Sequence, residues 1–288
     1  MKPSKKIGAM NRIIEDLKIR WLNSNSIPVV YFTDVKNVGD LLNEYLLPKI
    51  SGKNIVKVKT TMLPHLRAVG SVIGSSSPHS HVWGSGSIDG KTPSRKLDKK
   101  KIYALRGKKT RELISRSFNF ELGQVPLGDP AILMPMFYYP RISPSDNIGI
   151  VPHFSDEKIL EHYFNNKKIA NVKIIRVGQH PEKFVSDILS CKYILSSSLH
   201  GLILADTYGI PNRWIRLSDK LLGGSYKFID YYTTTDALVD DPMPMLEGGI
   251  FFQMIDRPDY FCRVNHYLYD PADLLESFPE KYMDFRDV

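Results

Sequence analysis

One stretch of the sequence, residues 191–211, constrains the fold more than any other. Residues 192–195 form a short apolar run of the kind found in buried strands, and a second apolar run begins at Leu199. Gly209 followed closely by Pro211 predicts the end of a helix there. The stretch therefore predicts a strand, a polar turn and a helix in immediate succession.

The polar turn of this unit contains Ser196, Ser197 and Ser198, and His200 follows at the start of the predicted helix. The N-terminus of a helix exposes unpaired N–H groups and attracts anions. It also lies here at the carboxyl end of a strand, where α/β sheets bind ligands. We predict a functional anion site at this turn. The alternative is that the serines only cap the helix and that His200 is a packing residue.

Further strand-like and helix-like runs alternate along the chain and predict an α/β fold with mainly parallel sheets. Candidate strands are residues 28–33, 55–58, 68–73, 81–83, 102–105, 148–151, 172–177 and 213–216. Residues 138–147 change abruptly to turn-forming composition. We place a linker there and divide the chain into domains 1–143 and 144–288. Residues 235–269 predict only irregular structure, and residues 271–279 predict a short C-terminal helix.

Composition narrows the class of protein. The 288 residues are 42% apolar and 24% charged, which suits a packed, water-soluble fold. Two cysteines make no disulfide framework, and Cys191 is expected to be a buried thiol, so a cytoplasmic setting is predicted. No apolar run is long enough to span a membrane. We predict no metal site and no resident cofactor. The glycines of residues 84–90 do not have the spacing of a dinucleotide-binding fingerprint.

The chain has a formal net charge of +8, and many of its lysines and arginines lie between residues 91 and 116. A basic face can bind nucleic acid, anionic lipid or a phosphorylated substrate, or can simply be solvated surface. No nucleic-acid-binding motif accompanies it, so we expect no nucleic-acid partner. Residues 1–26 predict a basic amphipathic helix. It either docks on the body of the protein or makes peripheral contact with the inner face of an anionic membrane.

Two further units place polar residues next to predicted strands. Asp40 follows the first candidate strand and is expected to be the N-cap of a helix, while Gly39 would let a ligand approach the backbone. Arg106 ends the strand of residues 102–105, and its guanidinium offers a fixed fork for phosphate or carboxylate. Asp129 is expected to form a turn or to orient hydroxyl groups of a ligand.

Five short segments, taken together and in this order, resemble the polysaccharide pyruvyltransferase family. They are Asn37-Val-Gly-Asp with Asn43, Trp83-Gly-Ser-Gly, Arg106-Gly-Lys-Lys-Thr-Arg-Glu, Ser198-Leu-His-Gly, and Lys227-Phe-Ile-Asp-Tyr. The resemblance implies that His200 is the catalytic acid. It implies donor binding by Arg106, Ser198, Leu199, Gly201 and Lys227. Acceptor binding would fall to Asn37, Gly39, Asp40 and Asn43.

This resemblance also implies a fold and an activity. The fold would be two Rossmann-like domains facing a cleft, as in GT-B glycosyltransferases, with the C-terminal helix returning to the first domain. The activity would be transfer of a pyruvyl group from phosphoenolpyruvate, the co-substrate, to a glycan or lipid-linked oligosaccharide in bacterial surface or exopolysaccharide synthesis. Two alternatives stay open: a nucleotide-sugar glycosyltransferase, and a glycan-binding relative without catalytic activity.

Overall fold

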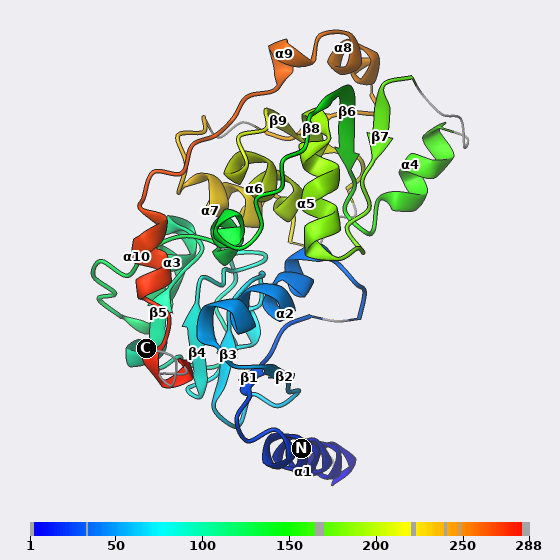
Figure 1. The fold of residues 1–288 in the computed structure, drawn as a ribbon. Coiled ribbons are helices and arrows are strands. Elements are labelled where there is room, and N and C mark those ends of the chain that lie inside the picture. The colour runs from blue at the N-terminus through cyan, green and yellow to red at the C-terminus, as the bar shows by residue number, and fades with distance from the viewer. Residues whose placement is uncertain are drawn as a thin grey trace.

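A computed structural model of the chain describes residues 3–32, 34–164, 170–219, 223–238, 241–247 and 249–283. Its named strands form two sheets of five strands each, one in each half of the chain (Figure 1). The first sheet contains β1 (Ile27–Val29), β2 (Ile55–Lys57), β3 (His65–Arg67), β4 (Ser80–Trp83) and β5 (Ile102–Ala104). The second contains β6 (Ser145–Val151), β7 (Val172–Ile174), β8 (Cys191–Ser196), β9 (Asn212–Arg216) and β10 (Met243–Pro244). The predicted α/β class with parallel sheets is confirmed.

Both sheets have the same topology. Their orders are β2-β1-β3-β4-β5 and β7-β6-β8-β9-β10, and every neighbouring pair of these strands is parallel. Counted within each half, the order is 2-1-3-4-5, as in flavodoxin-like folds. In such folds ligands bind at the switch point, where the strand order reverses between the first and third strands. Each half therefore has one such switch point, at the carboxyl ends of β1 and β3 and of β6 and β8.

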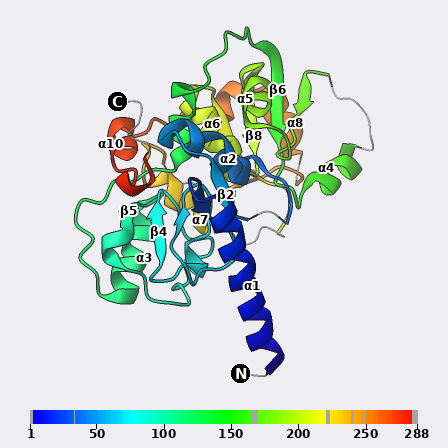
Figure 2. The same cartoon turned by 60° about the horizontal axis from the view of Figure 1, so that its bottom comes forward.

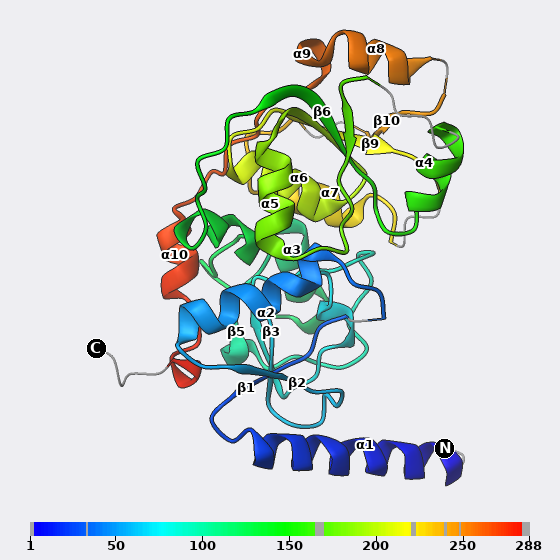
Figure 3. The ribbon, with the colours of Figure 1, turned by 45° about the vertical axis from the view of Figure 1, so that its right-hand side comes forward.

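Helices connect these strands and cover the sheets (Figures 1 and 3). The α-helices are α1 (Pro3–Leu22), α2 (Val38–Ser51), α3 (Lys108–Phe118), α4 (Glu157–Phe164), α5 (Pro181–Leu189), α6 (Leu199–Thr207), α7 (Tyr226–Tyr232), α8 (Ile250–Asp256), α9 (Pro258–Phe261) and α10 (Pro271–Glu276). Four 3₁₀ segments are η1 (Ile73–Ser75), η2 (Lys99–Lys101), η3 (Pro130–Met136) and η4 (Glu280–Tyr282). Among the helices that the structure describes, none has both the length and the hydropathy needed to cross a membrane.

One hydrophobic core runs through both halves. Its buried side chains include Leu42 of α2 and Trp83 of β4 in the first half, and Phe184 of α5 and Leu202 of α6 in the second. Helices α2 and α5 lie against each other, and the Tyr45 hydroxyl of α2 donates a 2.7 Å hydrogen bond to Glu182 of α5. The two sheets are therefore held together by continuous apolar packing.

The C-terminal segment returns to the first sheet. Trp83 donates its indole N–H to the carbonyl of Leu274 in α10 at 2.9 Å, and its ring meets Phe278 edge to face at 4.9 Å between centroids. Both residues are buried, and α10 lies beside the first half in Figure 1. The predicted C-terminal helix is thus present, and its anchor is a buried tryptophan.

Several local predictions were wrong. The N-cap of α2 is Asn37, whose side chain accepts from the Asp40 amide, and Asp40 is the third helical residue. The third strand of the first sheet is β3, upstream of the predicted run of residues 68–73. Residues 145–147 belong to β6 and not to a linker. Residues 235–269 contain β10, α8 and α9, elements of at most seven residues whose periodicity is too short to stand out in the sequence.

Candidate active site

A pocket of about 180 Å³ lies where the two switch points meet. Most of one side comes from segments that follow β1 and β3, with Ile88 after β4. Most of the other side comes from segments that follow β6 and β8, with Val177 after β7 and Lys227 on α7. The first half contributes Phe32, Asn37, Asp40, Gly70, Ser71, Val72 and Ile88, and the second contributes His153, Phe154, Val177, Ser198, Leu199, His200 and Lys227. A pocket below the usual range of drug-sized sites suits a small ligand better than an oligosaccharide.

The N-terminus of α6 opens into this pocket. Ser198 occupies the N-cap position, but its hydroxyl makes no capping bond. The first amides of the helix, those of Leu199 and His200, have no intrahelical partner by geometry. The Gly201 amide, by contrast, donates to the Ser198 carbonyl at 3.1 Å. The pocket end of α6 therefore offers two amides, one hydroxyl and the positive end of the helix dipole to an anion.

His200 lies between an acidic residue and a glycine. Its side chain is 12% exposed, and its Nε2 is 3.6 Å from Oδ2 of Asp129, which is fully buried. Neither atom has a hydrogen-bond partner among the described residues. The other side of the ring faces Gly39, where an added Cβ would lie 2.1 Å from Nδ1. The imidazole is thus packed between α2 and the start of η3, at the edge of the pocket.

Asp129 has a second contact that fixes its carboxylate. Its Oδ1 accepts the Ala131 amide at 3.1 Å and caps η3. The predicted turn role is therefore present, and the same side chain turns its other oxygen toward His200. A carboxylate aimed at one imidazole nitrogen can set the tautomer of the ring and stabilise its protonated form.

Among the described residues that line the pocket, Asp40 is the one with a carboxylate. Its side chain accepts a short hydrogen bond from the Asn37 amide, so the two predicted acceptor residues touch. Burial raises the pKa of Asp40 to about 6, although His200, Asn37 and Lys227 each act in the opposite direction. A carboxyl group with this pKa changes its protonation state close to neutral pH, which suits a general base.

Two basic side chains complete the pocket. Lys227 of α7 is 7% exposed, and burial, with a further contribution from Arg106, lowers its pKa to about 8. The ammonium group therefore keeps its charge at neutral pH, and a bound anion would raise its pKa further. His153 follows β6, and burial together with Lys227 lowers its pKa to about 3. His153 is thus a neutral hydrogen-bonding group at neutral pH.

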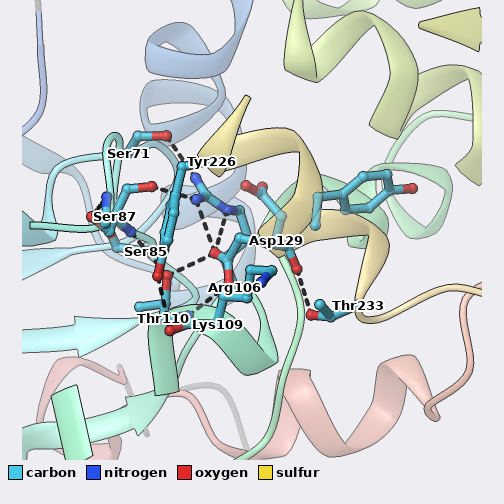
Figure 4. Close-up of polar contacts among 12 residues, drawn as sticks. Ser71, Ser85, Ser87, Arg106, Lys109, Thr110, Asp129, Tyr226 and Thr233 are labelled. Carbon is cyan, nitrogen blue, oxygen red and sulfur yellow. Dashed lines mark hydrogen bonds and ion pairs between the residues drawn. The ribbon is translucent and has the colours of Figure 1, made fainter. Parts of the chain in front are cut away.

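Arg106 lies outside the pocket lining, and its guanidinium is fully buried. It forms an ion pair with Asp230 of α7 at 2.9 Å, and it donates to the Ser71 hydroxyl and the Ser87 carbonyl, each at 2.6 Å (Figure 4). Thr110 binds the same carboxylate through its amide and its hydroxyl. The Arg106 guanidinium, which was predicted to bind the donor, therefore binds a carboxylate from the other half. Its link to the pocket is the hydrogen bond to Ser71.

Three other predicted residues also lie outside the lining. Gly39 packs against His200, as described above. Gly201 packs on the second sheet, where an added Cβ would meet the Ser196 hydroxyl at 2.3 Å. The Asn43 amide is fully buried and bonds to the backbone of Asp40 and Val69. These residues shape the loops around the pocket.

The sequence analysis missed eight residues that line the pocket: Phe32, Gly70, Ser71, Val72, Ile88, His153, Phe154 and Val177. Phe32 and Phe154 stack across the two halves with ring centroids 6.5 Å apart. The available signal was position, because all of them except Ile88 lie in a predicted strand or within three residues after one, but the pairing of loops from different halves could not be deduced from one sequence. Among the described side chains, no group of three or more His, Cys, Asp or Glu residues is arranged to hold a metal ion.

The fold and the pocket together define a two-sheet α/β protein with a small pocket between its switch points, to which the N-terminus of α6 is open. Comparisons with known proteins identify the family. The family model for polysaccharide pyruvyl transferase matches residues 82–219. Over 215 residues the chain is also 31% identical to the uncharacterized protein L143 of Acanthamoeba polyphaga mimivirus, an alignment that covers 71% of this chain and 73% of that protein. The chain belongs to the polysaccharide pyruvyl transferase family.

Proposed function

We propose that the protein transfers a pyruvyl group from phosphoenolpyruvate to two hydroxyls of a glycan, forming a ketal and releasing phosphate. The observation that carries the proposal is His200, which lies at the first turn of α6 in the pocket, beside Lys227 and backed by Asp129. Family membership gives the reaction class. The acceptor would be a glycan or a lipid-linked oligosaccharide of surface polysaccharide synthesis.

The donor is a small acid with a carboxylate and a phosphate, and the pocket matches both its size and its charge. The Leu199 and His200 amides and the Ser198 hydroxyl bind one anionic group at the helix N-terminus. The Lys227 ammonium, held at the same pocket by α7, binds the other. Because Lys227 is buried, its attraction for an anion is stronger than that of a surface lysine.

The reaction needs proton transfers at three points. His200 donates a proton to the methylene carbon of the donor, which becomes a methyl group and leaves an oxocarbenium-like centre at C2. The first acceptor hydroxyl forms a C–O bond to C2 and loses its proton. The C2–O bond to phosphate then breaks, and the second hydroxyl attacks C2 and gives its proton to the departing phosphate. Phosphate leaves with the electron pair of the broken bond.

Asp40 is the base that the geometry offers for the first acceptor hydroxyl. It belongs to the first half and faces the pocket next to Asn37, whereas the groups proposed for the donor belong to the second half. The pKa of Asp40 is raised to about 6, so the carboxylate is deprotonated at neutral pH. It is also a stronger base than an ordinary aspartate and can accept a proton from the hydroxyl. The proposed acid and base thus approach the reacting carbon from opposite halves of the chain.

Purified protein, phosphoenolpyruvate and a glycan acceptor test the proposal. We expect phosphate release that requires both substrates, with the ketal confirmed by mass spectrometry. His200→Gln should lose about 10²- to 10⁴-fold in turnover, the usual contribution of a general acid. It should still be stabilised thermally by phosphoenolpyruvate, because the binding groups remain.

His162→Gln is the matched control, because His162 is an exposed residue of α4. Near wild-type turnover by His200→Gln would remove the catalytic assignment. Sugar transfer from a nucleotide donor, without any use of phosphoenolpyruvate, would contradict the proposed reaction. Binding of glycan with no turnover of either donor would instead indicate a relative that has lost catalysis.

A further inference from the structure

Helix α1 lies at the front of Figure 2, and its exposed face carries a row of apolar side chains. Met10, Ile14, Leu17 and Trp21 are 57%, 44%, 50% and 78% exposed. At 100° per residue these four side chains occupy a sector of about 60° around the helix axis. We call them the α1 stripe. Exposed apolar groups aligned in this way indicate a docking surface.

The opposite face of α1 fixes the helix to the body of the protein. The Asp16 carboxylate is fully buried and accepts the amides of Lys59 and Thr60, the latter at 2.6 Å. Arg20 donates to the Pro64 carbonyl at 2.6 Å. Because the helix is held by this side, its orientation is defined and the stripe faces solvent. Figures 1 and 3 place α1 along the end of the first half that is remote from the second half.

The charge around the stripe is positive. Residues 1–22 contain Lys2, Lys5, Lys6, Arg12, Lys18 and Arg20 against Glu15 and Asp16. Asp16 is buried against the body, and Glu15 pairs with Lys59. Lys18 lies next to the stripe, about 40° beyond Ile14 around the helix. The helix therefore combines an exposed apolar stripe with a sequence of net positive charge.

Two kinds of partner could cover the α1 stripe, and the charge of the helix favours one of them. The spacing 10, 14, 17, 21 is also that of a coiled-coil seam, so a second copy of the chain is one candidate. In that arrangement the exposed Lys18 of each copy would add positive charge at the edge of the seam, next to a partner helix of the same charge. An anionic bilayer matches both properties, because it takes up the apolar side chains and attracts the lysines and arginines.

We propose that α1 docks the protein on the surface of an anionic membrane, with the α1 stripe inserted at the headgroup boundary. The helix would lie in the plane of the interface, and Trp21 would sit at the headgroup level that tryptophan prefers. Docking through this end keeps the pocket, at the junction of the two halves, away from the lipid (Figure 3). The proposal does not depend on the reaction proposed above.

Tryptophan fluorescence gives a direct measurement. The chain has three tryptophans, and Trp83 and Trp214 are 0% and 4% exposed. A blue shift on addition of vesicles therefore reports on Trp21. We expect the shift, and co-flotation, with vesicles of phosphatidylcholine containing about a quarter phosphatidylglycerol. Phosphatidylcholine alone should bind about 10- to 100-fold more weakly, and high salt should reduce binding.

Variants separate the apolar and the charged contributions. Leu17→Glu should lower vesicle binding at least about tenfold, since it places a charge in the stripe. Leu268→Glu is the matched control, because Leu268 is 57% exposed on another part of the molecule. Lys18→Glu should remove much of the preference for anionic lipid while leaving the melting temperature unchanged.

Three outcomes would overturn the proposal. One is the absence of binding to anionic vesicles at low salt. Another is equal binding by the wild type and Leu17→Glu. The third is a wild-type dimer that Leu17→Glu converts to a monomer, since a second copy of the chain would then be the occupant of the stripe.

Discussion

At the scale of single residues, the pairing of His200 with Asp129 is the least replaceable feature of the site. The two buried atoms that face each other, Nε2 and Oδ2, have no other partner among the described residues. The carboxylate can therefore act on the imidazole without competition. Asp129 is thus a positioning residue for the proposed acid.

Asp129→Asn tests this role cleanly. The substitution keeps an Oδ1 acceptor for the Ala131 amide and so preserves the cap of η3. It removes the negative charge opposite His200. We expect turnover to fall about 10²-fold, with donor affinity and melting temperature close to those of the wild type. A matching loss of thermal stability and turnover would mean that Asp129 is only a cap.

The pH profile of the reaction follows from two of the groups in the pocket whose pKa is perturbed, Asp40 and Lys227. Asp40 must be deprotonated to act as a base, and its pKa is about 6. Lys227 must be protonated to bind the donor, and its pKa is about 8. We expect kcat/KM to rise with pH through about 6 and to fall through about 8. The acidic limb should disappear in Asp40→Asn, and the basic limb should disappear in Lys227→Met.

Asp40 should also make stability depend on pH in a predictable direction. Its pKa is higher in the folded protein than the ordinary aspartate value of 3.8, so its contribution to stability is fully present below that value and is lost as pH rises through about 6. A shift of this size corresponds to roughly 3 kcal/mol. Asp40→Asn should therefore raise the melting temperature by several degrees at pH 8 and leave it nearly unchanged at pH 4. Equal changes at both values would contradict the assigned charge state.

Sequence patterns located several of these residues but not their contacts. Asn37, Asp40, Ser198, Leu199, His200 and Lys227 all line the pocket, since each follows a strand or begins a helix at a sheet edge. Their assigned roles stay predictions. Arg106 also lies at a sheet edge, but Asp230, more than 100 positions away, occupies its guanidinium. A long-range pair of this kind leaves no local signal.

At the scale of elements, the site depends on the close approach of α2 to the start of α6. Gly39 makes the approach possible, because its missing side chain leaves room for the His200 ring. The sequence predicted that this glycine would admit a ligand. In the structure the His200 ring occupies the space. Helix patterns in one sequence do not reveal which neighbouring helix an element will touch.

Gly39→Ala measures this contact. Alanine is the better helix former by up to about 1 kcal/mol, so propensity alone would stabilise the protein. Its Cβ would lie 2.1 Å from Nδ1 of His200, so the ring must move. We expect a loss of turnover of more than about tenfold without any gain in melting temperature. Gly74→Ala, at a site with open space around the Cβ, is the control and should leave turnover unchanged.

At the scale of the whole molecule, the two halves are joined by a buried ion pair as well as by the shared core. Arg106 follows β5 of the first half, and Asp230 belongs to α7 of the second. The same α7 carries Lys227, and the same arginine holds Ser71 at the pocket. The parallel pairing in both sheets was predicted from the alternation of elements in the sequence, whereas the strand order was seen only in the structure. The way the sheets face each other depends on contacts like this one.

Arg106→Lys and Asp230→Asn should therefore behave alike. Asparagine brings no charge to pair with Arg106, and lysine keeps the charge but lacks the fork that bonds Asp230, Ser71 and Ser87 together. Disrupting a buried pair costs about 3–5 kcal/mol, so each variant should melt roughly 5–10 °C lower. Both should bind phosphoenolpyruvate more weakly, since Ser71 and Lys227 lose their support, whereas the exposed Arg141→Lys should match the wild type. Thermal melts and donor titrations of the three variants decide the point. If Arg106→Lys alone lost donor affinity at an unchanged melting temperature, the guanidinium would contact the donor directly and would not serve as the tie between the halves.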